Sequence, residues 1–203
     1  YLQPMEQATR ITAVPFTWDS HPRRDAALRS LAFDAGEKPA IRFFTSEILA
    51  KAGTPEKSIY ADARTLRAWM RTNVKYQREA GEQIVLPPLL LSRPELGYDC
   101  DDQAVALAAM MISIGWQDRV RFNYWGNPLS HISVGVLGPQ GWKNVDPTED
   151  REIGWTPKQQ LTAGKPIGPT RGSLHGASNA AMFAPAVVAL LGVAALISWK
   201  LTK

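Results

Sequence analysis

The only cysteine in the chain, Cys100, is the first candidate for chemistry. It lies in Gly97-Tyr-Asp-Cys-Asp-Asp-Gln103, where a polar turn passes into an alanine-rich apolar segment. At the start of a helix, free backbone N–H groups and the positive end of the dipole favour thiolate over thiol. The same N–H groups can stabilise the oxyanion of an acyl substrate. The alternative is a cysteine that serves only as a small buried apolar residue.

Of the three histidines, His131 is the best placed to exchange protons with that cysteine. His21 lies among proline and arginine residues, and His175 lies in a stretch rich in glycine and serine. His131 instead opens an alternating apolar run, the pattern of a half-buried strand. Its imidazole either acts as a general base and acid or merely caps a strand edge.

Asp146 is the candidate for orienting the imidazole of His131. It follows the apolar stretch Gly141-Trp-Lys-Asn-Val145, and the glycine-containing turn 138–141 separates this stretch from the one that His131 opens. Two antiparallel strands joined by this turn bring His131 and Asp146 together at one end of a hairpin. The carboxylate can then fix the imidazole tautomer, although Asp-Pro-Thr is also a common turn sequence.

The aspartates around the cysteine raise the question of a metal site. Asp99, Asp101, Asp102, Cys100 and His131 are all of ligand type. However, the loop lacks the glycine and the terminal glutamate of a calcium-binding hand, and there is no second cysteine pair for zinc. Neither a phosphate-binding glycine loop nor a dinucleotide motif is present. We therefore expect no metal and no cofactor.

The segments that must position these residues are helical first and extended later. Residues 1–55 are predicted to form an irregular leader with short helices at about 25–33 and 45–52. Leu66, Trp69, Met70 and Val74 recur with helical spacing and predict a helix over about 60–76. A proline-containing loop over 78–97 and an alanine-rich helix over 101–115 follow.

Three short alternating stretches then predict strands at 120–124, 131–137 and 141–145. Helices followed by an antiparallel sheet give an α+β fold, with the cysteine helix packed on a small sheet. The chemistry-bearing domain is predicted to span 56–155.

The C-terminal part of the chain has a different composition. Residues 156–179 are rich in glycine, proline and serine and predict a linker. Residues 180–199 carry no charge and are long enough to cross a bilayer, which predicts a membrane span or a helix buried in a larger assembly. We therefore expect a membrane-associated protein or a component of a virus particle. The flanking lysines do not decide the orientation.

Size and charge narrow the remaining choices. A chain of 203 residues suits one domain with extensions. The net charge of +4 comes from interspersed residues, so we expect no nucleic-acid partner. A single cysteine forms no disulfide within the chain. The sequence opens with Tyr1, so we expect that an upstream segment has been removed or omitted.

The ordered combination of these pieces resembles the transglutaminase-like superfamily, which includes animal transglutaminases, microbial cysteine proteases and peptide N-glycanases. The resemblance covers about 58–150. Its pieces are Gly97-Tyr-Asp-Cys-Asp-Asp, Gly115-Trp, Ser130-His-Ile-Ser-Val and Gly141-Trp-Lys-Asn-Val-Asp-Pro-Thr.

The resemblance implies a papain-like α+β core with Cys100 as nucleophile, His131 as general base and acid, and Asp146 as the orienting carboxylate. Gly135 stands where the family often has an acidic residue shortly after the histidine, so the contacts on the substrate side are not implied. Tyr98 and Trp125 are candidates for lining the cleft or assisting the oxyanion, with packing as their alternative role.

The sequence thus predicts a cysteine acyl-transfer enzyme acting on amide bonds of a peptide or protein substrate. Water as acceptor makes it a protease or amidase, and a lysine amine makes it a transglutaminase. The alternative is a structural or interaction module in a membrane complex or virion, with little or no catalysis. Either form permits oligomers.

Overall fold

The computed structural model describes residues 21–54, 58–78, 84–127 and 129–168. The apolar segment predicted at 180–199 and residues 169–179 of the predicted linker lie outside these residues. Within the part of the chain that is described, no helix is both long enough and apolar enough to span a bilayer. The prediction of a C-terminal membrane or assembly helix therefore stays a prediction.

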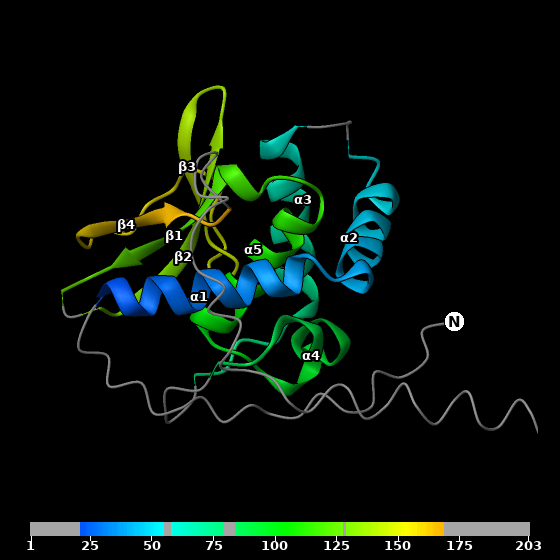
Figure 1. Cartoon of the computed structure of the whole chain (residues 1–203), viewed down its shortest axis with the longest axis horizontal. Coiled ribbons are helices and arrows are strands. Elements are labelled where there is room, and N and C mark those ends of the chain that lie inside the picture. Colours follow the sequence, from blue (N-terminus) through cyan, green and yellow to red (C-terminus); the bar gives the residue numbers. More distant parts are fainter. Residues whose placement is uncertain (1–20, 55–57, 79–83, 128, 169–203) are drawn as a thin grey trace, which may run out of the picture. The chain divides into compact units, whose positions relative to one another are not determined.

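Helix α5 (Cys100–Ser113) lies at the centre of the fold, between the other helices and the sheet (Figure 1). Every residue from Asp101 to Ser113 is buried. A helix that is apolar on nearly all sides must be enclosed on nearly all sides, and four helices together with two strands supply that cover. The predicted cysteine helix is confirmed, and it ends at Ser113 because Gly115 adopts a positive φ of 95°.

The N-terminal region contributes to this core through two helices that overlap the short helices predicted at about 25–33 and 45–52 but are longer, so residues 21–51 are not an irregular leader. Helices α1 (His21–Gly36) and α2 (Pro39–Lys51) both contact α5. Leu28 and Ala32 of α1 are completely buried. The sequence pattern does not mark this face, because the apolar residues of α1 are not gathered on one side of the helix, so tertiary contacts decide its position.

Helix α3 (Ile59–Asn73) confirms the predicted amphipathic helix. The Ser58 side chain caps it by accepting a hydrogen bond from the N–H of Ala61 at 3.4 Å. The helix ends before Tyr76, because the chain leaves it to form an isolated parallel bridge with Tyr98. The predicted loop over 78–97 contains helix α4 (Pro87–Ser92) and a 3-10 turn, η1 (Pro94–Leu96).

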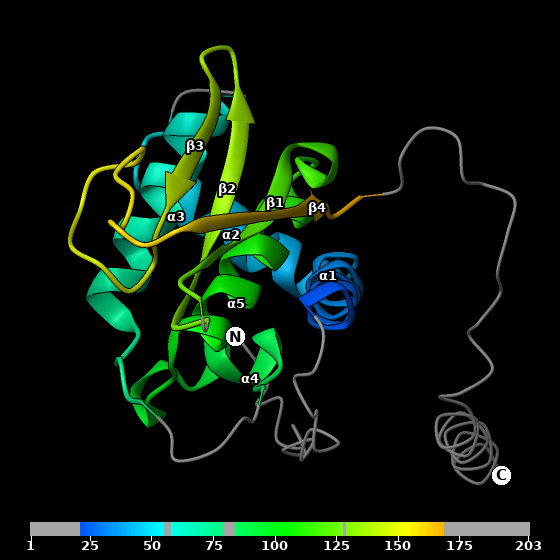
Figure 2. The same cartoon turned by 90° about the vertical axis from the view of Figure 1, so that its left-hand side faces the viewer.

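Four antiparallel strands form one sheet in the order β3-β2-β1-β4 (Figure 2). The three predicted strands are confirmed. The fourth strand lies in the segment predicted as a linker from residue 156 and corrects that prediction. It pairs with β1 and not with β3, the strand that precedes it in the sequence. The strands are β1 (Val120–Trp125), β2 (His131–Gly138), β3 (Gly141–Val145) and β4 (Leu161–Pro166), with the 3-10 turn η2 (Gln117–Arg119) before β1.

The two faces of this sheet differ in chemistry. Ile132, Val134 and Val136 alternate along β2 and belong to the hydrophobic core that contains α5. His131 and Ser133 occupy the alternating positions and therefore point to the other face. The α+β core is thus apolar on the helix side and polar on the side that carries the candidate histidine.

Candidate active site

Cys100 is the first residue of α5, and its side chain is half-buried. The Asp99 carboxylate caps the helix by accepting a hydrogen bond from the N–H of Asp101 at 3.3 Å. Gly97 has a φ of +93°, and a Cβ at this position would lie 2.8 Å from the Cβ of Gln77. Glycine therefore allows the extended segment around Gln77 to pack directly against the turn that presents the cysteine.

The backbone N–H of Cys100 differs from those that follow it in the helix. The N–H of Asp101 bonds to the Asp99 carboxylate, that of Asp102 to the Asp101 carboxylate at 3.0 Å, and that of Gln103 to the Asp99 carbonyl at 3.2 Å. Among the hydrogen bonds between described residues, none uses the N–H of Cys100. This donor is thus available beside the sulfur.

His131 and Asp146 are hydrogen-bonded, with 2.6 Å between His131 Nε2 and Asp146 Oδ2. His131 is the first residue of β2, and Asp146 directly follows β3, so the hairpin brings them together as predicted. The other oxygen of Asp146 accepts hydrogen bonds from the N–H and the hydroxyl of Thr148, at 3.0 and 2.8 Å. The carboxylate is thereby held on both sides.

The imidazole of His131 bonds to Asp146 and lies near Cys100. Burial alone would lower the pKa of His131, but hydrogen bonds to Asp146 and to Cys100, and the charges of both, raise it to about 10. Since Nε2 bonds to Asp146, Nδ1 is left for Cys100. Burial would raise the pKa of Asp146, but His131 and Thr148 outweigh it and hold that pKa below its ordinary value.

Two arginines of α3 hold the segment that carries Asp146. Arg67 donates to the carbonyl of Asp146 at 3.1 Å and to that of Glu149 at 2.6 Å. Arg71 donates to the carbonyl of Thr148 at 2.6 Å. Sequence reasoning missed both residues, because arginines on a helix normally signify a solvated face.

Tyr98 and Trp125, the candidates for lining the cleft or assisting the oxyanion, are almost entirely buried. The Tyr98 hydroxyl donates to the carbonyl of Arg93 at 2.8 Å. The indole N–H of Trp125 donates to the Ser133 hydroxyl at 2.7 Å. Both polar groups have partners inside the protein, which favours the packing alternative for these two residues.

Tyr76 is a residue near Cys100 that sequence reasoning missed. Its side chain is half-exposed, and its backbone is bridged to Tyr98, two residues before the cysteine. Burial raises the pKa of Tyr76, and the charges of Cys100 and Asp99 raise it further, so the phenol lies within electrostatic reach of the start of α5. No sequence signal indicated this, because the helical spacing made Tyr76 the last residue of a helix.

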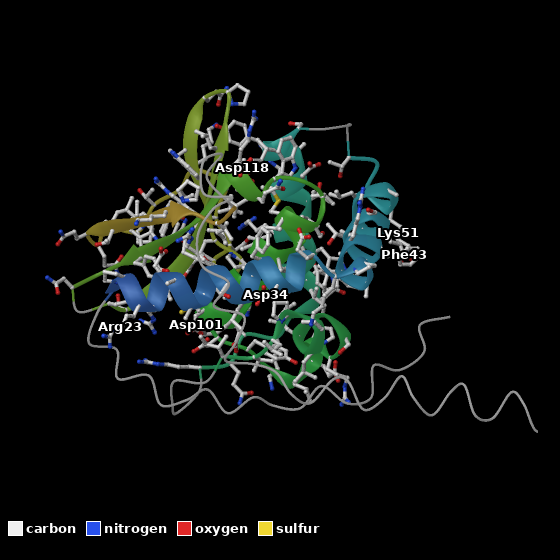
Figure 3. All side chains as sticks on the ribbon, in the orientation of Figure 1. Arg23, Asp34, Phe43, Lys51, Asp101 and Asp118 are labelled. Atoms are coloured by element: carbon white, nitrogen blue, oxygen red, sulfur yellow. The ribbon has the colours of Figure 1, made fainter. Side chains whose placement is uncertain are left out.

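The three aspartates at the start of α5 also lie close together, with ligand oxygens within 4.8 Å of one another. Asp99 caps the helix, and the Asp102 carboxylate accepts the N–H of Val85 at 2.6 Å. Asp101 lies beside α1 (Figure 3), 3.9 Å from Arg24. Burial is the largest cause that raises the pKa of Asp101 to about 10, and Asp99 is the next. The positive charge of Arg24, 3.9 Å away, is too weak to cancel this increase. The cluster thus contributes to helix capping and packing.

A separate hollow of about 610 Å³ lies between α2 and α3. Phe44, Ile48, Ala68 and Trp69 provide its apolar lining, and Phe44 meets Trp69 edge-to-face at 5.1 Å between ring centroids. None of the residues that line it is Cys100, His131 or Asp146.

Comparison with known proteins identifies the family. The model of the transglutaminase-like superfamily matches residues 43–147, from α2 to the residue after Asp146. No curated protein and no solved structure matches the chain. The matched segment is just over half of the 203 residues and includes Cys100, His131 and Asp146. The chain therefore belongs to the transglutaminase-like superfamily.

Proposed function

We propose that this protein is a cysteine-dependent acyl-transfer enzyme that acts on amide bonds of a peptide or protein. Cys100 is the nucleophile, His131 the general base and acid, and Asp146 the group that orients the imidazole. The observation that carries the proposal is the position of the His131 ring, which bonds to Asp146 at 2.6 Å and lies near enough to Cys100 for the cysteine to raise the pKa of the imidazole. Membership of the transglutaminase-like superfamily supports it.

The first step forms the acyl-enzyme. With a pKa near 10, His131 is protonated at neutral pH, and an imidazolium beside Cys100 favours the thiolate. The sulfur attacks the amide carbonyl carbon, a C–S bond forms, and the oxygen takes up negative charge. We expect the N–H of Cys100 to donate to this oxyanion, with the Tyr76 hydroxyl as a second candidate donor.

The second step releases the amine. His131 gives its proton to the nitrogen, the C–N bond breaks, and a thioester remains on Cys100. Water then attacks the thioester in a hydrolase, whereas a lysine amine attacks it in a transglutaminase. In both cases His131 takes the proton of the attacking group, and the thiolate leaves.

The experiment that tests this proposal measures the alkylation of Cys100 by iodoacetamide from pH 5 to pH 9. We expect His131→Ala to slow alkylation at pH 7 by roughly tenfold or more, since the imidazolium that favours the thiolate is lost. His175→Ala is the matched control and should leave the rate unchanged.

Equal rates in the wild type and in His131→Ala would contradict the proposal. So would a Cys100 that does not react in the folded protein. Either result would leave the interaction module as the explanation of the fold. A panel of peptides and amines, assayed with Cys100→Ser as the inactive reference, then identifies the acyl acceptor.

A further inference from the structure

A chain of buried polar side chains crosses the sheet on the face that carries His131. The Trp125 indole N–H donates to the Ser133 hydroxyl at 2.7 Å, and this hydroxyl donates to Asn144 Oδ1 at 2.6 Å. The Asn123 amide donates to the same oxygen at 2.8 Å, and the Asn144 amide donates to the carbonyl of Trp155 at 2.9 Å. We call Trp125, Ser133, Asn144 and Asn123 the sheet network.

The sheet network lies next to the candidate catalytic pair. Trp125 is directly opposite His131 in the register of β1 and β2. Ser133 is two residues after His131 on β2, and Asn144 is two residues before Asp146, which follows β3. Ser133 and Asn144 therefore lie on the same face of the sheet as His131 and Asp146. The hydrogen bond between Ser133 and Asn144 therefore lies next to the hydrogen bond between His131 and Asp146 along the two strands.

Such a network costs stability unless its members are satisfied, and this one is satisfied and closed to water. Ser133 is fully buried, and the other three side chains of the sheet network are at most 5% exposed. A buried, fully bonded polar network is rigid, because each member fixes the direction of the next. An apolar sheet face would pack equally well and would need no hydrogen-bond partners, which suggests that these polar groups do more than stabilise the strands.

We propose that Trp125, Ser133 and Asn144 are positioning residues for His131 and Asp146, an inference that rests on the proposed function. The side chain opposite His131 across the two strands lies close enough to limit rotation of the imidazole. Ser133 holds the Trp125 indole in place, and Asn144 fixes the spacing of β2 and β3 where the carboxylate meets the imidazole. Nδ1 is thereby kept directed at Cys100.

A pair of serine-to-alanine variants tests this role. Ser133→Ala removes the central hydroxyl of the sheet network. Ser113→Ala removes another buried hydroxyl, which bonds to the carbonyl of Met110 at 2.7 Å at the far end of α5 from Cys100. Both variants are expected to lose thermal stability, so stability alone does not distinguish a structural role from a positioning role.

The readouts that distinguish these roles are the alkylation rate of Cys100 and the NMR titration of the His131 ring. We expect Ser133→Ala to slow alkylation at pH 7 by about tenfold and to shift the His131 titration to lower pH, whereas Ser113→Ala leaves both unchanged. Trp125→Phe keeps the ring but removes the indole donor, and it should shift both readouts in the same direction. This variant also covers the case in which Ser133→Ala fails to fold.

The outcomes separate this inference from the proposed function. If wild-type alkylation depends on His131 while Ser133→Ala and Trp125→Phe match Ser113→Ala, the positioning role is overturned and the enzyme proposal stands. If wild-type alkylation does not depend on His131, the enzyme proposal is overturned and the positioning role with it.

Discussion

At the scale of single residues, the central feature is the pair of His131 and Asp146, which meet at 2.6 Å at one end of a β-hairpin. The Asp146 side chain is only 2% exposed, and that of His131 is 19% exposed. A carboxylate buried to this degree needs partners, and it has them in His131 and Thr148. The charge state of the imidazole therefore depends on this aspartate.

Asp146→Asn should separate charge from shape at this site. The amide keeps the volume and a hydrogen bond but loses the negative charge, so we expect the pKa of His131 to fall from about 10 toward its ordinary value of 6.5. Acyl transfer should drop by roughly a hundredfold or more, as when a triad loses its carboxylate. NMR titration of the imidazole together with the alkylation rate checks this. An unchanged titration would show that the charge of Asp146 does not act on His131.

The same pair gives a pH dependence of stability. The folded pKa of His131 is raised, so its contribution is fully present below pH 6.5 and is lost as the pH rises through about 10. The pKa of Asp146 is lowered, so its contribution is present above pH 3.8 and is lost as the pH falls below that value. The two groups therefore act at opposite ends of the pH range, and of this pair only His131 acts above neutral pH.

We therefore expect the free energy of unfolding to decline between pH 7 and pH 10 in the wild type. His131→Gln should reduce the slope of this decline, because it removes one of the two titrating groups; the part that comes from Asp101, whose pKa is also raised to about 10, should remain. Urea unfolding at a series of pH values measures both curves. A decline of the same slope in the two proteins would assign it to other groups.

At the scale of elements, the turn before α5 decides how the cysteine is presented. Gly97 combines a positive φ with a close approach to Gln77, whereas Gly115 has a similar φ of +95° and open space around it. The two glycines thus separate the cost of the backbone conformation from the cost of a steric clash. Substitution of Gly97 therefore tests the contact between residues 75–77 and the turn before α5.

Gly115→Ala should lower stability by about 1–2 kcal/mol, the cost of a left-handed conformation. Gly97→Ala should lose about 1–3 kcal/mol more, because its Cβ would overlap Gln77. We also expect Gly97→Ala to slow Cys100 alkylation, since the turn must shift. Denaturant unfolding and the alkylation rate measure these effects, and equal losses in both variants would rule out the clash.

At the scale of the whole molecule, the open question is how the C-terminal segment is used. Residues 180–199 lie outside the described residues, and their uncharged composition predicts a membrane span or an assembly helix. These alternatives differ in what the domain needs from the segment. A membrane span only tethers it, whereas an assembly helix completes a packed interface.

Truncation after Ser178 distinguishes the two. If the segment is a membrane span, the full chain should partition with lipid vesicles, and the truncated chain should stay in the aqueous phase with an unchanged melting temperature. Flotation of vesicles and thermal unfolding measure this. A truncated chain that aggregates or unfolds would favour the assembly helix.

The sequence alone determined the α+β order of elements and the three residues on which the proposed chemistry depends. Helices α3 and α5 could be predicted from the sequence. Burial on one side gives a periodic pattern of apolar residues, and burial on all sides gives a continuous apolar segment. Cys100, His131 and Asp146 could be selected because few residue types perform acyl transfer, and because the chain has one cysteine and three histidines.

Only the tertiary structure decided what surrounds those three residues. The polar face of the sheet, the arginines of α3 that bond to the Asp146 segment, and the place of Tyr76 depend on contacts between positions far apart in the chain. The same holds for the full length of α1, predicted as a short helix in an irregular leader, and for β4, predicted as linker. The local sequence pattern indicates whether a side chain is buried, whereas tertiary packing determines which residue that side chain contacts.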